Sequence, residues 1–223
     1  AASLGLTMIP DKLKTTYENY LKRFNNISVR EDSGREILRS LGIESSVVLD
    51  PTLLISPLEW QKIENKPGNI DGKYIFCYFL NGEHTYRDKV AEFSKLHNIK
   101  VIGISSNPKD HDWINILNNI GPREFLWLVH NAEYVFTDSY HGTIFSIIYN
   151  RRFVSLRRFS EKDSISQNSR IDQLKMWFAI NDNVFNINNY DPHRPIEQSS
   201  EAYEKNIGVL REKSLQYIRQ ALG

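Results

Sequence analysis

The sequence predicts an α/β fold with Rossmann-like parallel sheets, and three observations support this class. Short runs of β-branched and aromatic residues alternate with helical segments along most of the chain. Helix-start signals lie between these runs, as where Ser56 is followed by Pro57 and Glu59. The composition, with 40% hydrophobic and 25% charged residues, is that of a chain that buries a core. Strands that alternate with helices need right-handed crossovers, so we expect mostly parallel strands.

The first part of the chain, to about residue 65, is expected to alternate in this way. The expected elements are helix 11–24, strand 26–29, a helix opened by Ser33, strand 47–49 and a helix that begins at Pro57. Ser33 and Glu36 have the spacing of a capping box, in which each side chain satisfies a free backbone N–H. Gly42 stands where that helix would stop.

A candidate linker, residues 64–72, contains Pro67, Gly68 and Gly72 and separates two periodic regions. The elements expected beyond it are strand 74–80, helix 86–97, strand 100–105, helix 122–131, strand 134–137, helix 142–149 and strand 153–156. We therefore expect residues 1–65 to be the C-terminal part of an N-terminal Rossmann-like lobe. Residues 72–195 are expected to form a C-terminal Rossmann-like domain, followed by a helix at 200–222 that can cross back to the first lobe.

Charge, apolar runs and cysteine content exclude several classes of protein. The chain has 28 Lys and Arg against 27 Asp and Glu, a net charge of +1, and so lacks the basic surplus of a nucleic-acid binder. Its apolar runs, such as residues 74–80, are far shorter than the roughly 20 residues of a membrane span. The single Cys77 excludes an internal disulfide and fits a reducing compartment, so we expect a cytoplasmic protein, peripheral to a membrane at most.

The N-terminal residues 1–5 have neither an initiator Met nor the zones of a signal peptide. An apolar, strand-like start is unusual for a complete domain. We therefore expect the N-terminal lobe to be incomplete.

The most informative segment, residues 134–146, runs from an apolar strand through polar residues into a helix. The unpaired N–H groups and the positive dipole end of a helix start attract phosphate or carboxylate. Ser139, His141 and Thr143 add side-chain donors, and Gly142 permits close approach of an oxyanion. The alternative is that Asp138 or Ser139 only caps the helix and that His141 packs against a neighbour.

Basic residues gather downstream, with seven Lys and Arg against three acidic residues between positions 151 and 175. Such a group can hold a dianionic substrate through charge-assisted hydrogen bonds. For any one arginine the alternative is a solvated face on which its aliphatic stem packs. Arg158 and Arg170 are the candidates we retain for substrate binding.

Two further candidates follow strands nearer the N-terminus, where the strand ends of α/β proteins carry function. Arg30 and Glu31 follow one strand, and Asp50 follows the next. The alternatives are a local ion pair between Arg30 and Glu31, and a turn at Asp50 before Pro51, which we favour for Asp50.

Several familiar motifs are missing from the sequence. It contains no G-x-G-x-x-G and no G-x-x-x-x-G-K-[ST], so dinucleotide and P-loop nucleotide sites have no support. The histidines show no H-E-x-x-H or paired-ligand spacing. No cofactor or metal is therefore expected.

Taken together, these motifs resemble the polysaccharide pyruvyl transferase family in both order and spacing. The matching segments are Ser-Val-Arg-Glu at 28–31, Asp-Pro-Thr at 50–52, Pro-x-Glu-Phe at 122–125, Ser-x-His-Gly-Thr at 139–143, Phe-Ser at 145–146, the basic strand at 153–158 and Asn-Ser-Arg-Ile at 168–171. The resemblance covers about residues 1–180. Some branches of the family carry an arginine where this chain has Ser139, so Arg170 or Arg158 would have to supply that charge.

The resemblance implies a two-lobed fold like that of GT-B glycosyltransferases. It also implies transfer of the pyruvyl group of phosphoenolpyruvate to two hydroxyls of a sugar in a cell-surface or exopolysaccharide precursor, which forms a ketal and releases phosphate. The acceptor would be a lipid-linked or polymeric sugar. Two alternatives stay open: a GT-B-type glycosyltransferase that uses a nucleotide sugar, and a non-catalytic glycan-binding subunit.

On this resemblance each candidate residue receives a role. His141 is assigned to acid–base or phosphate-stabilising work, and Arg30 and Arg170 to the anionic groups of the donor. Glu31 is a lesser candidate for the base that activates an acceptor hydroxyl. The remaining substrate-binding candidates are Asp138, Ser139, Gly142, Thr143 and Arg158.

Overall fold

The chain forms two units, each with its own parallel sheet, in a computed structural model that describes residues 2–6, 8–80, 84–104, 114–159, 166, 168–198 and 200–223. Unit 1 comprises Ala1–Ile55, Phe159–Ala179 and Ala202–Gly223, and unit 2 comprises Ser56–Arg158 and Ile180–Glu201. The predicted C-terminal domain, residues 72–195, differs from this division because it includes residues 159–179. The structure groups that segment with unit 1, where Gln173 accepts a hydrogen bond from the backbone N–H of Asp32 at 2.8 Å.

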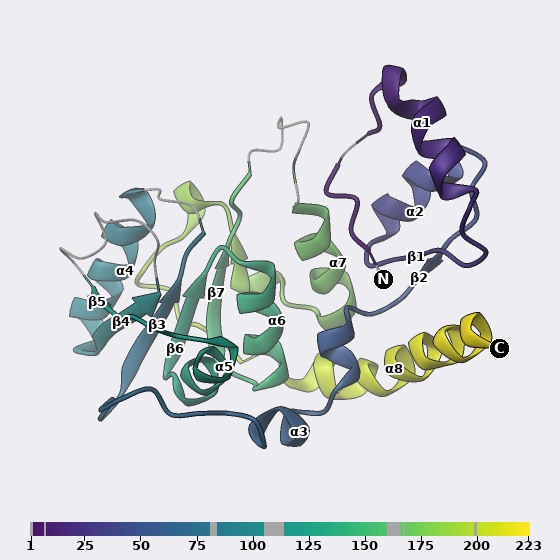
Figure 1. Ribbon diagram of the computed structural model, residues 1–223. Coiled ribbons are helices and arrows are strands. Elements are labelled where there is room, and N and C mark those ends of the chain that lie inside the picture. Colours follow the sequence, from purple (N-terminus) through teal and green to yellow (C-terminus); the bar gives the residue numbers. More distant parts are fainter. Residues whose placement is uncertain are drawn as a thin grey trace. The chain divides into compact units, whose positions relative to one another are not determined.

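Within its described residues, unit 2 is built on a six-stranded parallel sheet with the strand order β5-β4-β3-β6-β7-β8 (Figure 1). The strands are β3 (Tyr74–Tyr78), β4 (Lys100–Ile104), β5 (Asn115–Ile116), β6 (Tyr134–Thr137), β7 (Arg152–Leu156) and β8 (Val184–Phe185). The chain runs outward from β3 to β5 and then returns to the other side of β3. This order is that of a Rossmann sheet, and its reversal point lies between β3 and β6.

Helices cover both faces of the unit 2 sheet. In the central strand β3, neighbouring side chains pack against helices on opposite faces. The helices are α3 (Pro57–Gln61), α4 (His84–His97), α5 (Pro122–Asn131) and α6 (Tyr140–Ile148). Cys77 joins a buried cluster with Phe93 of α4, whereas the neighbouring Phe76 packs on Phe125 of α5 with ring centroids 5.9 Å apart. Because both faces are covered, central strands of this kind read as continuous apolar runs.

Unit 1 holds a two-stranded parallel sheet of β1 (Ser28–Val29) and β2 (Ser46–Val47) within the residues that the structure describes. Its helices are α1 (Asp11–Leu21), α2 (Asp32–Arg39), the short 3₁₀ helix η1 (Pro51–Leu54), α7 (Asn168–Phe178) and α8 (Ser200–Leu222). The backbone of Ala2 pairs with the free edge of β1, donating to Ser28 at 3.0 Å and accepting from Arg30 at 2.9 Å.

The final helix α8 is tied to the segment that follows β2. Ser214 accepts a hydrogen bond from the backbone N–H of Leu49 at 3.0 Å, and the Arg211 guanidinium donates to the carbonyl of Leu53 at 2.7 Å. These bonds explain why the end of the chain belongs to the same unit as its beginning. Among the described helices, none is both long and apolar enough to cross a membrane.

Most predicted elements are confirmed, and a few differ in their bounds or were not predicted. Ser56 caps α3 as predicted, since its hydroxyl accepts from the N–H of Glu59 at 3.3 Å. The predicted capping box at Ser33 and Glu36 is wrong, because α2 already begins at Asp32 and Ser33 lies inside it. Helix α7 and the two-residue strands β5 and β8 are present without having been predicted. Ser105, the predicted end of one strand, lies outside the described residues.

Gly103 of β4 provides a test of how tightly this sheet is packed. A Cβ atom there would come 2.8 Å from the carbonyl oxygen of Cys77 and 2.8 Å from a methyl carbon of Ile114. Gly103→Ala is therefore expected to lower the free energy of unfolding by about 1–3 kcal/mol, measured by denaturant titration. The matched control is Gly208→Ala in α8, where a Cβ meets nothing within 4 Å and alanine favours the helix. Equal stability of the two variants would contradict the packing described.

Candidate functional site

The site lies in unit 2, at the carboxyl ends of β3 and β6, where the strand order reverses. Two side chains bridge the strand ends: the Thr137 hydroxyl donates to the carbonyl of Tyr78 at 2.7 Å, and the Asp138 carboxylate accepts from the N–H of Leu80 at 2.7 Å. Ligands of open α/β sheets bind in the crevice at such a reversal point. The predicted site segment therefore stands at the place where the topology favours a ligand.

Helix α6 begins at this edge, and Ser139 is its N-cap. The Ser139 hydroxyl accepts from the N–H of Gly142 at 3.4 Å, and its carbonyl accepts from the N–H of Thr143 at 3.0 Å. The capping role, one of the two alternatives raised by the sequence, is thus observed for Ser139. The predicted phosphate contact of Ser139 would have to share the same hydroxyl.

Close packing requires a glycine at position 142, and this requirement could not be predicted from the sequence. A Cβ at this position would lie 2.3 Å from the Thr137 hydroxyl oxygen. The glycine therefore lets α6 approach β6 closely, and the geometry favours this role over the close approach of an oxyanion.

Thr143 is fully buried and committed to internal hydrogen bonds. Its hydroxyl bonds to the carbonyl of Ser139 at 3.1 Å and to the hydroxyl of Ser155 on β7 at 2.7 Å. This geometry favours a role in holding α6 on the sheet over the predicted phosphate contact.

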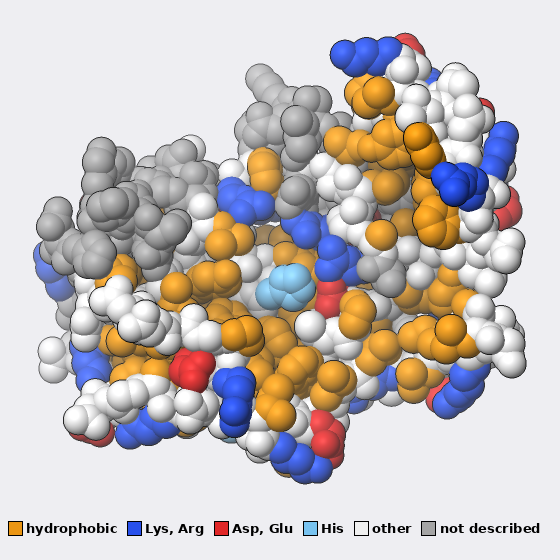
Figure 2. Space-filling model, viewed as in Figure 1, with side chains coloured by type: hydrophobic (Ala, Val, Ile, Leu, Met, Phe, Trp, Pro, Cys, Tyr) orange, Lys and Arg blue, Asp and Glu red, His pale blue; other side chains and the backbone are white. Residues whose placement is uncertain are grey.

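His141 is exposed in the first turn of α6 and lines a cavity of about 440 Å³. Tyr78, Phe125 and Phe145 give this cavity aromatic walls, and Pro122 marks the start of α5 at its rim. Figure 2 shows hydrophobic side chains gathered on the surface over α5 and α6. An imidazole beside two helix N-termini and an apolar wall can exchange protons with a small anionic ligand.

The electrostatic setting of Tyr78 follows from the same geometry. Burial, and then the negative charge of Asp138, raise the pKa of the Tyr78 phenol above its ordinary value. The phenol therefore stays protonated at neutral pH and can donate a hydrogen bond. Asp138 itself is buried, and its carboxylate fixes the turn that leads into α6.

Arg158 is the basic candidate that belongs to unit 2. It follows β7 by two residues and so stands at the same edge of the sheet as Asp138. Arg170 lies on α7 in unit 1. Glu161, Lys162 and Asp163, three of the charged residues counted between positions 151 and 175, lie outside the described residues.

In unit 1, Arg30 and Asp50 follow the adjacent strands β1 and β2 and form an ion pair. Their side chains are 16% and 2% exposed, respectively. Asp50 also accepts from the N–H of Thr52 at 3.0 Å, which confirms the favoured turn before η1. The alternative pairing of Arg30 with Glu31 is not the observed one, because the neighbouring strand brings Asp50 to the guanidinium.

Glu31 is 1% exposed and holds the N-terminal segment. One carboxylate oxygen accepts from the hydroxyl of Ser3 at 2.8 Å and from the N–H of Leu4 at 3.2 Å. The other oxygen is buried without a hydrogen-bond partner among the described residues. This environment favours a structural role for Glu31 over that of a base for an acceptor hydroxyl.

The aromatic wall of the cavity was not among the features predicted from the sequence. Tyr78, Phe125 and Phe145 come from a strand and two helices, and their rings contact in series, at 5.1 Å between Tyr78 and Phe125 and 6.0 Å between Phe125 and Phe145. Strand alternation could have placed Tyr78 on the face opposite Cys77. The meeting of the three rings depends on the strand order, which the local pattern does not contain.

Comparison with known proteins assigns the family. The model of the family described as polysaccharide pyruvyl transferase matches residues 1–159. The chain belongs to this family. The predicted resemblance is thereby confirmed. The comparison with curated proteins finds no match.

One solved structure supports the fold of this pyruvyl transferase family member, and a second is reported for its similarity alone. A putative UDP-N-acetylglucosamine 2-epimerase from Listeria monocytogenes superposes with a TM-score of 0.54 at 13% identity, covering 89% of this chain and 60% of that one. The UDP-GlcNAc 2-epimerase from Methanocaldococcus jannaschii gives 0.47 at 17% identity, covering 85% and 61%. The chain thus spans about three fifths of the length of these proteins. The predicted class, parallel α/β with a GT-B-like fold, is confirmed.

The buried pair of hydroxyls at Thr143 and Ser155 yields a test of the structural role given to Thr143. Thr143→Val leaves the Ser155 hydroxyl without this partner, and we expect the free energy of unfolding to fall by about 1–3 kcal/mol. Adding Ser155→Ala removes the hydroxyl that has lost its partner. The double variant should therefore lose less free energy of unfolding than the sum of the losses in the two single variants. Strict additivity in denaturant titrations would show that the two hydroxyls do not interact.

Proposed function

We propose that this protein transfers the pyruvyl group of phosphoenolpyruvate to two hydroxyls of one sugar, forming a ketal and releasing phosphate. The acceptor is proposed to be a lipid-linked or polymeric precursor of a cell-surface or exopolysaccharide, met in the cytoplasm. Family membership supports the reaction class. The observation that carries the proposal is the exposed His141 at the start of α6, at the rim of a cavity beside the reversal point of the sheet.

The chemistry requires one addition and one displacement at the same carbon of the donor. One sugar hydroxyl bonds to the central carbon of the enol while the methylene carbon takes up a proton. The second hydroxyl then bonds to the same carbon as the bond to the phosphate oxygen breaks. The first hydroxyl loses one proton while the methylene carbon gains one and becomes a methyl group. The proton of the second hydroxyl leaves with the phosphate, so no oxidant or reductant is consumed.

His141 is the group we assign to these proton transfers. An imidazole changes charge near neutral pH and can therefore both accept a hydroxyl proton and return it. The aromatic side chains form an apolar wall of the cavity that His141 lines, and a bound anion that covers this wall would interact with the imidazole more strongly than in bulk water. The protonated phenol of Tyr78 is a further hydrogen-bond donor on this wall.

Positive charge for the phosphate and carboxylate of the donor is proposed to come from arginines and the helix start. Arg158 stands on the same sheet edge as α6 and is the arginine we propose for the site in unit 2. Arg30 and Arg170, the further candidates of the sequence, belong to unit 1, where an ion pair with Asp50 holds the Arg30 guanidinium. Glu31 and Thr143 receive no chemical step, because their polar atoms hold the fold.

Replacement of His141 tests the proposed proton transfer. Phosphate release from phosphoenolpyruvate in the presence of sugar acceptors is expected to fall by about 10²–10⁴-fold in His141→Ala, because a positioned acid–base group is lost. His193→Gln is the matched control, since His193 is also exposed and pairs with Glu92 away from the cavity. Unchanged turnover in the His141 variant would remove this residue from the mechanism.

Ligand-dependent stability separates the proposed donor from a nucleotide sugar. At about 100 times its dissociation constant a ligand stabilises the folded protein by about 2.7 kcal/mol, which raises the melting temperature. We expect phosphoenolpyruvate to raise the melting temperature more than the same concentration of inorganic phosphate. A larger rise with UDP or GDP than with phosphoenolpyruvate would instead favour glycosyl transfer.

A further inference from the structure

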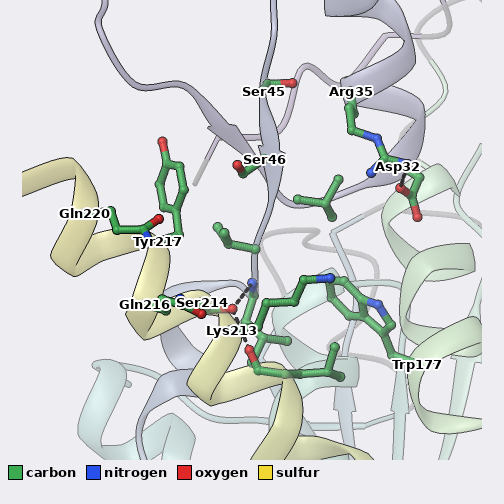
Figure 3. A pocket seen from close by; sticks show the side chains of 14 residues that line it. Asp32, Arg35, Ser45, Ser46, Trp177, Lys213, Ser214, Gln216, Tyr217 and Gln220 are labelled. Carbon is green, nitrogen blue, oxygen red and sulfur yellow. Dashed lines mark hydrogen bonds and ion pairs between the residues drawn. The ribbon is translucent and has the colours of Figure 1, made fainter.

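A second cavity, of about 430 Å³, lies wholly in unit 1, between the outer edge of β2 and helix α8. Figure 3 shows Ser45 and Ser46 on the strand side, Tyr217 and Gln220 on the helix side, and Trp177 of α7 at the far end. We call this cavity the α8 groove. None of the residues proposed for pyruvyl transfer lines it.

The backbone of β2 is open toward the groove. The N–H groups of Ser46 and Val48 donate to β1, at the carbonyls of Ile27 and Val29, both at 3.0 Å. Because alternate residues of a strand point their backbone groups to opposite edges, the N–H and C=O of Val47 face the groove. The groove therefore offers a backbone donor and acceptor next to each other.

Unused polar side chains surround this open edge. Across the part of the chain that the structure describes, no hydrogen bond or ion pair engages the side-chain polar groups of Lys213, Gln216, Tyr217 or Gln220. The Ser45 hydroxyl oxygen is buried and also has no hydrogen-bond partner there. A buried polar atom without a partner is unfavourable and is commonly satisfied by a ligand or water. The lining is thus rich in both donors and acceptors that remain available.

Charge in the groove is limited and partly neutralised. The Arg35 guanidinium is 2.7 Å from a carboxylate oxygen of Asp32, so the two largely cancel, and Lys213 is the remaining cation among the lining residues. One flexible ammonium is a weak basis for binding a nucleotide or a diphosphate, which needs several fixed positive charges. The lone Asp32 carboxylate does not provide the ligand set of a metal ion.

Two aromatic side chains add flat apolar surface to the polar lining of the groove. Trp177 and Tyr217 are half-buried, and the bond from Asn206 to the carbonyl of Trp177, at 2.7 Å, fixes the backbone of that tryptophan. Such rings give a large rigid contact surface for C–H groups at low entropic cost, while amides and hydroxyls bind neighbouring oxygens. A ligand that presents both features, with C–H faces and many neutral hydroxyls, is a saccharide.

We propose that the α8 groove binds a short, neutral segment of an oligosaccharide. In this site the rings of Trp177 and Tyr217 pack on sugar faces, and Gln216, Gln220 and the β2 edge bind hydroxyls. The site would hold a glycan chain on unit 1 independently of the chemistry at His141. It does not rest on phosphoenolpyruvate being the donor.

The test measures saccharide binding by saturation-transfer NMR and titration with the intact protein, using maltotriose, cellotriose and N-acetylchitotriose as probes. We expect at least one trisaccharide to bind, and its affinity to fall by about tenfold or more in Trp177→Ala. The double change of Gln216→Ala and Gln220→Ala, both at exposed positions of α8, should weaken binding without affecting the fold. The matched control is Tyr20→Ala, an aromatic residue of α1 that is 60% exposed and lies outside the groove.

The outcomes are distinguishable from those of the transfer reaction. Binding that persists in His141→Ala while phosphate release is lost would support a separate glycan site. Absence of binding by all three trisaccharides would overturn the proposal, as would binding that is insensitive to both groove variants. Binding of inorganic phosphate or UDP that is lost in Lys213→Met, without saccharide binding, would also overturn it by assigning an anion site to the groove.

Discussion

One hydroxyl group, that of Thr137, sets the geometry of the site in unit 2. It donates to the carbonyl of Tyr78 on β3, accepts from the N–H of Ser139, and occupies the space that a side chain on Gly142 would need. These three relations fix the separation of β3 from β6, the first turn of α6 and the distance of α6 from the sheet. The position of His141 follows from them, because it lies in that first turn. A short strand with a threonine at its end thus determines where an exposed imidazole meets an aromatic cavity.

In unit 1, an ion pair connects the ends of two neighbouring strands, as hydrogen-bonding side chains do in unit 2. Arg30 and Asp50 stand at the ends of neighbouring parallel strands, and their buried ion pair joins those ends as Thr137 and Asp138 join β3 to β6. A buried pair of this kind adds little to stability compared with apolar packing, but it keeps a guanidinium in one orientation. In both units the carboxyl ends of the strands carry polar side chains whose first task is to connect strands. A side chain at these positions that also binds a ligand must do so while it keeps its bond between the strands.

The sequence predicted the features that depend on neighbouring residues. Helix α5 and strand β6 have the expected bounds, and the caps at Ser56 and Ser139 need only residues within one helical turn. Features that depend on distant residues were not predictable in this way. The start of α2 involves a bond from Asp32 to Gln173, 141 positions away, which local capping rules at Ser33 cannot include. Strands β5 and β8 are too short to show a period, and the partner of Arg30 lies 20 positions along the chain.

The order of segments in unit 1 has a consequence for biosynthesis. This unit combines residues 1–55 with two later segments, residues 159–179 and 202–223, and α8 supplies the bonds that secure Leu49 and Leu53. A ribosome delivers α8 after all of unit 2, whereas domains generally fold as their residues emerge. Leu49 and Leu53 therefore stay without their α8 partners until unit 2 has been synthesised, and during that interval this part of the nascent chain is open to contact by chaperones.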